Sequence, residues 1–418
     1  MTGVASTQRC PQCGAAVPVL PAYSTWCECG WNLAPPARAE PRTRLDRVSA
    51  SLGRRLGDRL ANALTAAETL ESGLTPAKAG AYAVAALVYA LTIALAVGGV
   101  LLIVVPFPHI AGSVLGFLML ATAALMRPRL GSLPDERLVS REEAPELYRL
   151  ADEIASALGT RSVDAIAVDH AFNASWSIVG LRRRRLLTLG LPLLAALGPE
   201  ERVAVIAHEL AHGRNGDATR GLLVGSSLRG LGELYLLLTP DDDEGLVAFL
   251  LTRVYWLLSR PVLALLLLQL HLALRDSQRA EYLADALAAE VAGTEAVIRT
   301  HEKLLLEPLL YAAIGRAARA ASGEQVDAFD ELATAVAGVP ERERERRRRV
   351  ARLQDARLDD THPPTAKRIE VLERRTGQPG RVFADAARSA AVDRELLGRR
   401  RALQATLVDE FRDALFYG

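Results

Sequence analysis

The sequence predicts a mainly α-helical membrane protein with a small β-sheet. Half of its 418 residues are hydrophobic and 24% are charged, a mixture typical of apolar membrane segments joined to a water-facing domain. Runs with helical spacing dominate the chain, whereas strand-like runs occur only between residues 163 and 189. All four cysteines lie in the first thirty residues, which indicates a separate small module at the N-terminus.

Composition excludes two classes of protein. The 50 basic residues nearly balance the 49 acidic ones, for a net charge of +1, so no overall field attracts the protein to nucleic acid. The large apolar content can bury a real core, which excludes a mainly disordered chain. We therefore expect folded modules with the lipid bilayer, and not nucleic acid, as a partner.

The N-terminal module, residues 1–33, is predicted to be a zinc ribbon. Cys10 and Cys13 form one pair, and Cys27 and Cys29 form a second pair with one residue fewer between them. Two such pairs in a segment too small for its own core are typical of a tetrahedral structural zinc site. A redox pair or unpaired thiols are the alternatives. Ribbons bind protein, nucleic acid or nothing, so a protein partner for this module stays open.

Residues 34–80 are predicted to form a linker followed by an amphipathic helix. The linker is rich in proline and arginine and cannot sustain a helix. Leucines about four residues apart, with arginines between them, then indicate a helix over residues 45–73. Two interpretations fit this helix equally well: it lies on an anionic bilayer surface, or it packs on its own protein.

Residues 81–127 are predicted to form a transmembrane helical hairpin. Residues 82–105 contain no charge, and a helix of that length spans about 36 Å, enough to cross a bilayer core of about 30 Å. A second apolar run covers residues 110–126. Arginines flank the hairpin on both outer sides and are absent from its loop, which places both ends in the cytoplasm. We therefore expect a multi-pass protein of the cell membrane, with a buried soluble hairpin as the alternative.

Residues 134–375 are predicted to form the main globular domain. A helix is expected over residues 145–158, and three strands with a turn at Arg182–Arg185 are expected over residues 163–168, 172–179 and 186–189.

The later part of the chain is predicted to be helical. Residues 246–274 are apolar but interrupted by Arg253, Arg260 and Pro261, so a third membrane span or a pair of shallow helices would both fit. The charged run at residues 341–349 is expected to be a solvated helix face, and residues 376–418 are expected to form a C-terminal helical extension.

The run HELAH at residues 208–212 contains the candidate metal-binding and catalytic residues. His208 and His212 are four apart, so on a helix both imidazoles can reach one metal ion. Glu209 can lie beside the open metal position and take the proton of a zinc-activated water. This is the pattern of a zinc-dependent hydrolase, and the alternative is two histidines on an ordinary helix.

A catalytic zinc needs a third protein ligand. Asn215 and Ala218 occupy the positions where an extended HExxHxxGxxH site would have glycine and histidine, which favours a distant glutamate. Glu281 fits best, because Asp285 lies one turn further along the same predicted helix and can hold a zinc-bound imidazole from behind. The competing ligands are Glu233, Glu290 and His271.

Several motifs together resemble those of the membrane-bound zinc metallopeptidases of the HtpX-like and CAAX prenyl endopeptidase group. The matching motifs, in the order of that family, are FNA at 172–174, HELAH at 208–212 with NGD at 215–217, AEYLAD at 280–285, and THPP at 361–364 with Arg368 and Ile369.

The resemblance implies a gluzincin-type fold and a cytoplasmic-facing endopeptidase site beside the membrane. It implies Glu281 as the third zinc ligand and Asp285 behind a histidine. His362 and Arg368 match a C-terminal motif of the family. His362 is then a candidate to stabilise the tetrahedral oxyanion, and a structural histidine before two prolines is an equal alternative.

We therefore expect an endopeptidase that cleaves membrane or membrane-proximal proteins, with one catalytic and one structural Zn²⁺. Glu209 would act as its general base. One alternative is a membrane sensor-protease that cleaves a single regulator. Another is a non-catalytic membrane scaffold in which the ribbon recruits a partner and the protease-like domain is vestigial.

Overall fold

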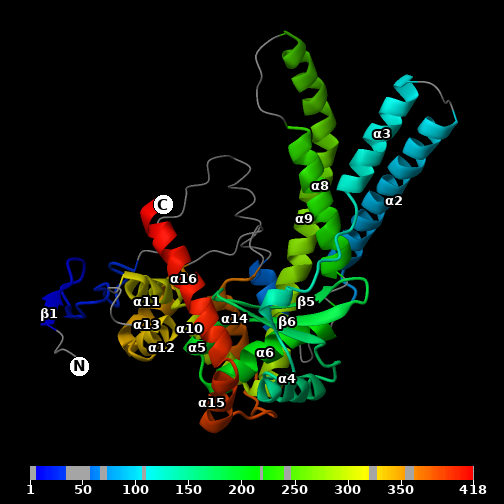
Figure 1. Cartoon of the computed structure of the whole chain (residues 1–418). Coiled ribbons are helices and arrows are strands. Elements are labelled where there is room, and N and C mark those ends of the chain that lie inside the picture. Colours follow the sequence, from blue (N-terminus) through cyan, green and yellow to red (C-terminus); the bar gives the residue numbers. More distant parts are fainter. Residues whose placement is uncertain are drawn as a thin grey trace.

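The computed structural model describes residues 6–33, 57–65, 73–105, 110–216, 220–239, 246–319, 327–353 and 362–417. Most of the predicted linker and amphipathic helix lies outside these residues. The fold is mostly helical, with one four-stranded and one two-stranded sheet in the described part (Figure 1).

The N-terminal module is built on a short hairpin. Strands β1 (Ser6–Arg9) and β2 (Ala16–Val19) pair antiparallel. Gly14 adopts a positive φ of 73° in the turn between them, a conformation that glycine adopts without strain. The hairpin presents the first cysteine pair, and an irregular segment that follows presents the second pair.

The four-stranded sheet has the order β3-β4-β6-β5, and β5 lies at its edge. β4 pairs parallel with β6, whereas β3 and β5 are antiparallel to their neighbours. The strands are β3 (Leu138–Val139), β4 (Ala165–Asp169), β5 (Ala174–Val179) and β6 (Arg184–Gly190). The predicted arginine turn is therefore shorter than expected, because Arg184 and Arg185 already belong to β6.

Helices cover this sheet and share its core. The main hydrophobic cluster joins residues of the sheet with residues from most of the helices of the globular part. These helices are α4 (Pro145–Ala157), α5 (Leu191–Ala196), α6 (Pro199–Arg214), α10 (Thr294–Leu304), α11 (Glu307–Arg319), α12 (Ala328–Ala337), α14 (Thr365–Arg374), α15 (Ala386–Glu395) and α16 (Leu397–Tyr417). Helix α13 (Glu341–Arg352) contributes Val350 to a separate small cluster, and a short 3₁₀ turn, η1 (Asp135–Arg137), precedes β3.

Four helices extend away from the globular part (Figure 1). They are α2 (Pro76–Val104), α3 (Ile110–Leu125), α8 (Ser226–Leu237), which continues a π-helical turn η2 (Gly221–Gly225), and α9 (Leu246–Ala292). In the described residues, α2 and the part of α9 from Thr252 onward are long and apolar enough to cross a membrane. Large apolar side chains such as Ile93 and Phe117 are more than 60% exposed, which fits a lipid environment.

The α2–α3 hairpin is held by close contact between glycines. A Cβ atom added at Gly99 would lie 2.7 Å from the carbonyl oxygen of Gly116, and one added at Gly116 would lie 2.6 Å from that of Gly99. Small residues at a crossing let two membrane helices approach closely.

The apolar segment at residues 246–274 is part of one continuous helix. α9 runs without interruption for 47 residues and contains Pro261 within it, so the alternative of two shallow helices is not seen. Figure 1 shows α9 descending beside α2 into the globular part. The lower end of α9 enters the main core through Ala284, Ala288 and Val291.

Two peripheral segments pack on the globular part. The described piece of the amphipathic helix, residues 57–65, buries Ala61 and Leu64 against Tyr282 and Val371. This packing agrees with the interpretation that the helix lies on its own protein. The C-terminal helices α15 and α16 also contribute to the main core, and Glu395 of α15 accepts hydrogen bonds from the first turn of α4.

The expectation that residues 341–349 form a solvated helix face is wrong. Glu343 is 1% exposed and accepts hydrogen bonds from Arg346 and Arg347 within α13. Arg348 binds Glu302 of α10. Charge pairing inside and around the helix therefore allows a run of arginines to be half-buried.

Candidate active site

Helix α6 presents the two histidines of the HELAH run. Pro199 begins the helix, and the Glu201 carboxylate accepts a hydrogen bond from the N–H of Gly198 at 2.6 Å. This arrangement satisfies a backbone donor at the start of the helix. On the next turns, the Nε2 atoms of His208 and His212 lie 3.2 Å apart.

Helix α9 brings a carboxylate to the same point. Glu281 Oε2 lies 3.5 Å from His208 Nε2, and Glu281 Oε1 lies 3.6 Å from His212 Nε2. One ligand atom from each of the three residues lies within 4.8 Å of the others. Glu281 is 3% exposed, and its Oε2 makes no hydrogen bond of good geometry. Two imidazole nitrogens and a buried carboxylate oxygen suit a zinc ion with its fourth position open.

The competing ligands predicted from the sequence lie elsewhere. Glu233 pairs with Arg129 at 2.7 Å, and Glu290 pairs with Arg381 at 2.8 Å. His271 lies on the apolar part of α9 and belongs to neither group of potential metal ligands found in the described residues. The structure therefore brings together His208, His212 and Glu281, and leaves out the competitors.

Asp285 lies behind His208, one turn below Glu281 on α9. Its Oδ1 is 3.0 Å from His208 Nδ1, so the carboxylate can fix the orientation of the imidazole. Arg368 of α14 donates to both Asp285 oxygens, at 2.6 and 2.7 Å. The Nε2 of buried His301 from α10 is 3.1 Å from Asp285 Oδ1.

Arg368 places a buried positive charge beside the acids of the site. Its side chain is 8% exposed, and its Nη1 lies 3.2 Å from Glu281 Oε2. Burial raises the pKa values of Glu281 and Asp285, but Arg368 and the neighbouring histidines outweigh burial and hold both pKa values well below their ordinary range. Both carboxylates are therefore ionised at neutral pH.

Asp285 and Glu281 also stabilise the protonated, positively charged form of His208. Burial lowers the pKa of His208, but its contacts with Asp285 and Glu281 outweigh that effect and raise the pKa to about 10. Glu209 differs from the other two carboxylates, because burial raises its pKa above the ordinary value against the opposing effect of His208 and His212. A raised pKa suits a group that must accept and return a proton near neutral pH.

His362 lies at the edge of the site. Its Nδ1 is 2.9 Å from Glu281 Oε2, and its side chain is 63% exposed. The imidazole is therefore close enough to the three candidate ligands to meet a bound substrate.

A cleft of about 820 Å³ opens beside this centre. Residues 170–176 line it with the connection before β5 and the first part of that edge strand, and Glu209 and His362 also line it. Apolar residues from several helices also line it, namely Pro192, Leu193, Ala204, Val205, Val297, Leu304, Ile314 and Leu407.

Two residues of this region were missed by the sequence analysis. Trp176 of β5 contacts α6 where residue 213 is glycine, and a Cβ added at Gly213 would lie 2.9 Å from Trp176 Cζ2. His301 contacts Asp285 from a helix with no recognisable motif. The signal for His301 was weak, namely a histidine on the inner face of an amphipathic helix.

The four cysteines form a second group of potential metal ligands. One Sγ atom from each lies within 4.8 Å of the others. Cys10 and Cys27 are buried, whereas Cys13 and Cys29 are exposed. Four thiols at this spacing suit a closed tetrahedral zinc site, and the cluster is compatible with a zinc ribbon.

The fold and these residues define a membrane-attached metallopeptidase with a gluzincin-type site. Residues 141–376 match the model of Peptidase family M48, and the chain belongs to this family. It is therefore a hydrolase, an HtpX-like membrane zinc metallopeptidase that acts on peptides or proteins.

Two curated proteins are similar to the chain, and both are named Protease HtpX homolog. The one from Pyrococcus furiosus is 26% identical over 262 residues, which cover 59% of this chain and 79% of that protein. The one from Pyrococcus abyssi is 26% identical over 253 residues, with the same two shares. No solved structure matches the chain.

Proposed function

We propose that the protein is a membrane endopeptidase whose catalytic zinc is held by His208, His212 and Glu281. The observation that carries this proposal is the convergence of their ligand atoms within 4.8 Å at the side of a cleft. A zinc ion in this place would polarise the peptide carbonyl and lower the pKa of a water molecule, so that the water can lose a proton and attack the carbonyl carbon. Asp285 would hold His208 through the opposite ring nitrogen, and Arg368 would hold Asp285.

Glu209 is the proposed general base. It follows His208 on α6 and lines the cleft. Its carboxylate would take a proton from the attacking water and return it to the leaving amine. Exposed His362, whose Nδ1 lies 2.9 Å from Glu281 Oε2, is proposed to donate a hydrogen bond to the oxyanion of the tetrahedral intermediate.

The cleft supports an extended peptide as substrate. β5 is an edge strand, and an edge strand offers unpaired backbone groups to which a peptide can add as a further strand. A substrate lying there would pass Glu209 with its backbone. The apolar residues that line the cleft would then contact the side chain next to the scissile bond.

The predicted specificity can be measured on cleaved peptides. We expect large apolar residues such as leucine and phenylalanine to be enriched beside the scissile bond, because burial of such a side chain contributes about 1.5–3 kcal/mol. Mass spectrometry of products from a peptide library would give the profile. A preference for charged residues at both positions flanking the cut would contradict the proposal that the apolar residues of the cleft bind the substrate side chain.

Topology supports a cytoplasmic site. The helix pairs α2–α3 and α8–α9 both begin and end at the globular part (Figure 1). In sequence, the two connecting segments, residues 106–109 and 240–245, contain no lysine or arginine, and the second contains four acidic residues. Arginines follow α3 at the opposite end. By the positive-inside rule, this distribution of charge supports a cytoplasmic peptidase domain and ribbon.

The test of the mechanism is Glu209→Gln. This substitution keeps the shape of the side chain but removes the base, so we expect full metal content and a loss of cleavage of at least 100-fold. Metal is counted by mass spectrometry and cleavage by a fluorogenic peptide. Glu200→Gln on the same helix, where Glu200 is exposed and pairs with Arg299, is the matched control and should cleave normally.

Undiminished cleavage by the Glu209→Gln protein would exclude Glu209 as the base. The same measurements address the scaffold alternative, because a vestigial domain would neither cleave nor hold a metal at His208. That alternative is disfavoured by the arrangement of His208, His212 and Glu281 around one point, by Asp285 behind His208, and by the cleft beside them.

A further inference from the structure

The cysteine ribbon lies against α13 of its own chain. Trp26 is 1% exposed, and it packs in a small apolar cluster with Leu33 of the ribbon and Val350 of α13. A buried tryptophan at the contact of two modules is typical of an anchoring side chain.

Two arginines of α13 form a cradle for this tryptophan. The guanidinium carbon of Arg342 lies 4.5 Å from the centroid of the Trp26 ring, and that of Arg349 lies 5.0 Å from it. Arg342 also donates to the backbone oxygen of Trp26 at 2.6 Å, and Arg349 pairs with Glu28 at 2.6 Å. Both guanidinium groups therefore attract the face of the indole ring as well as neighbouring oxygens of the ribbon.

The ribbon residues that touch the cradle flank its cysteines. Trp26 precedes Cys27, and Glu28 lies between Cys27 and Cys29. The ribbon's own apolar cluster contains only Cys10, Val17 and Cys27, with Trp31 packed beside it, which is too little to fold such a short segment. Its shape must therefore depend on a metal bound by the thiols.

We infer that the partner of the ribbon is α13 of the same chain, and that metal binding by the ribbon is required for this contact. The cysteines fix the position of Trp26 and Glu28, and the arginine cradle receives them. This inference uses the proposed metal site of the ribbon, and it does not depend on the proposed peptidase mechanism.

Helix α13 connects this contact to the helices around the active site. Arg348 pairs with Glu302 of α10 at 2.7 Å, and the preceding residue, His301, contacts Asp285. On another side α13 faces α14, which carries Arg368. The ribbon thus contacts a helix that lies against α10 and α14, the helices that carry the two side chains bound to Asp285.

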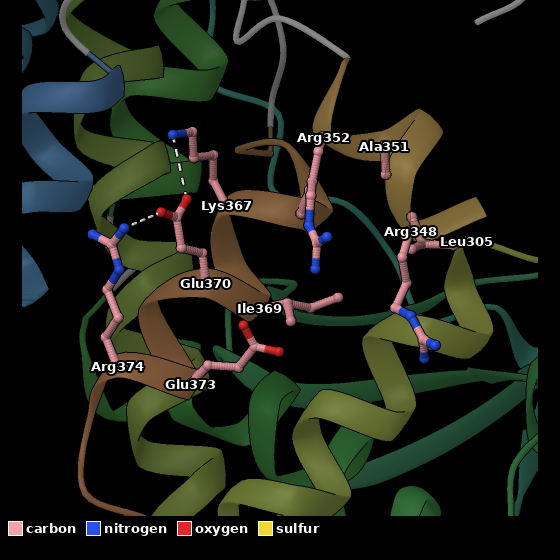
Figure 2. Close-up of a pocket in the computed structure, with 10 residues that line it drawn as sticks. Leu305, Arg348, Ala351, Arg352, Lys367, Ile369, Glu370, Glu373 and Arg374 are labelled. Atoms are coloured by element: carbon pink, nitrogen blue, oxygen red, sulfur yellow. Dashed lines mark hydrogen bonds and ion pairs between the residues drawn. The ribbon is translucent and has the colours of Figure 1, made fainter. Parts of the chain in front are cut away.

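Packing between α13 and α14 is incomplete. A cavity of about 450 Å³ opens between parts of the two helices, which contact each other elsewhere, and Figure 2 shows Arg348 and Arg352 on the α13 side and Lys367 and Glu370 on the α14 side. Because part of this interface is unfilled, the other contacts of α13 help to hold it in place. The ribbon supplies one of these contacts, and Glu302 supplies another.

The test measures amide hydrogen exchange in the full-length protein in lipid nanodiscs. The double substitution Cys13→Ser and Cys29→Ser removes ribbon ligands, and we expect faster exchange over residues 341–352. The double substitution Arg342→Ala and Arg349→Ala removes the cradle. We then expect exchange over residues 24–33 to rise about tenfold, the size predicted by the loss of two cation–π contacts, while the metal content stays unchanged.

Arg352→Ala is the matched control, because Arg352 lies on the same helix and faces the cavity instead of the ribbon. It should leave exchange over residues 24–33 unchanged. If the cysteine variant leaves α13 protected, or if the cradle variant leaves the ribbon protected, the inference is overturned. Loss of peptide cleavage with normal exchange would concern the proposed function alone.

Discussion

The side chains around Asp285 decide how firmly the site can hold a metal. Asp285 connects His208, one of the proposed ligands, to Arg368 and His301, so removal of its charge would loosen His208 and leave Arg368 buried without its main partner. A single carboxylate that touches no metal itself thus supports the geometry of the centre.

Asp285→Asn should therefore weaken zinc binding about 10- to 100-fold, the usual effect of losing such a support. Competition with a chromophoric chelator measures the affinity. Glu290→Gln, further along α9 at a pair with exposed Arg381, is the control and should bind zinc normally. Equal affinities in the two variants would show that Asp285 does not orient the ligand.

At the level of residues, the part of the candidate site that is local in sequence could be predicted from spacing alone. The spacing of His208 and His212 fixes them on one helical face before any fold is known. Glu281 needed the resemblance as well, because the sequence alone left three competing ligands. His301 was not found, since its contact with Asp285 arises only when α10 packs beside α9.

At the level of elements, neighbouring glycines in α2 differ in what surrounds them. A Cβ at Gly99 would meet a backbone oxygen of α3 at 2.7 Å, whereas a Cβ at Gly98 would meet only the flexible end of Met119 at 2.9 Å. Backbone cannot move aside without separating the helices, but a methionine tip can rotate.

Gly99→Ala should consequently destabilise the hairpin by about 1–3 kcal/mol, and Gly98→Ala should have little effect. Thermal unfolding of both variants in nanodiscs compares them directly. If the two substitutions lower the melting temperature equally, close packing at Gly99 does not hold α2 against α3.

Secondary-structure elements were predicted well where the hydrophobic residues follow a single period. The environment of helices that contain several arginines was predicted poorly. The expected strands of the main sheet are found with small shifts at their ends. For residues 246–274 the sequence left a third span and a pair of shallow helices open, and the structure has one continuous helix, in which Arg260 lies over the ring of Trp256 and the helix continues through Pro261. The arginines of α13 suggested solvent, yet their partners are glutamates of the same helix, of α10 and of the ribbon, and a tryptophan of the ribbon.

At the level of the whole molecule, the two groups of ligands predict two bound metal ions per chain. Glu281→Gln should reduce the count to one and abolish cleavage, whereas the cysteine double variant should reduce it to one and leave the histidine site filled. Elemental mass spectrometry of purified protein checks both. A single ion in the unaltered protein, lost from the cysteine variant, would support the scaffold alternative.

The modular plan of the molecule was visible in the sequence, but its assembly was not. Hydropathy and cysteine spacing indicated a ribbon, a hairpin and a peptidase domain. The docking of the ribbon on α13 joins segments more than 300 residues apart, and no local pattern encodes such a contact.

Because α9 is continuous, it fixes the distance between the membrane and the proposed site of peptide cleavage. Its last strongly apolar stretch ends near Leu274, and Glu281 follows seven residues later on the same rigid rod, about 10 Å further along the axis. Scissile bonds should therefore fall within a narrow band above the lipid, whatever the sequence of the chain being cleaved.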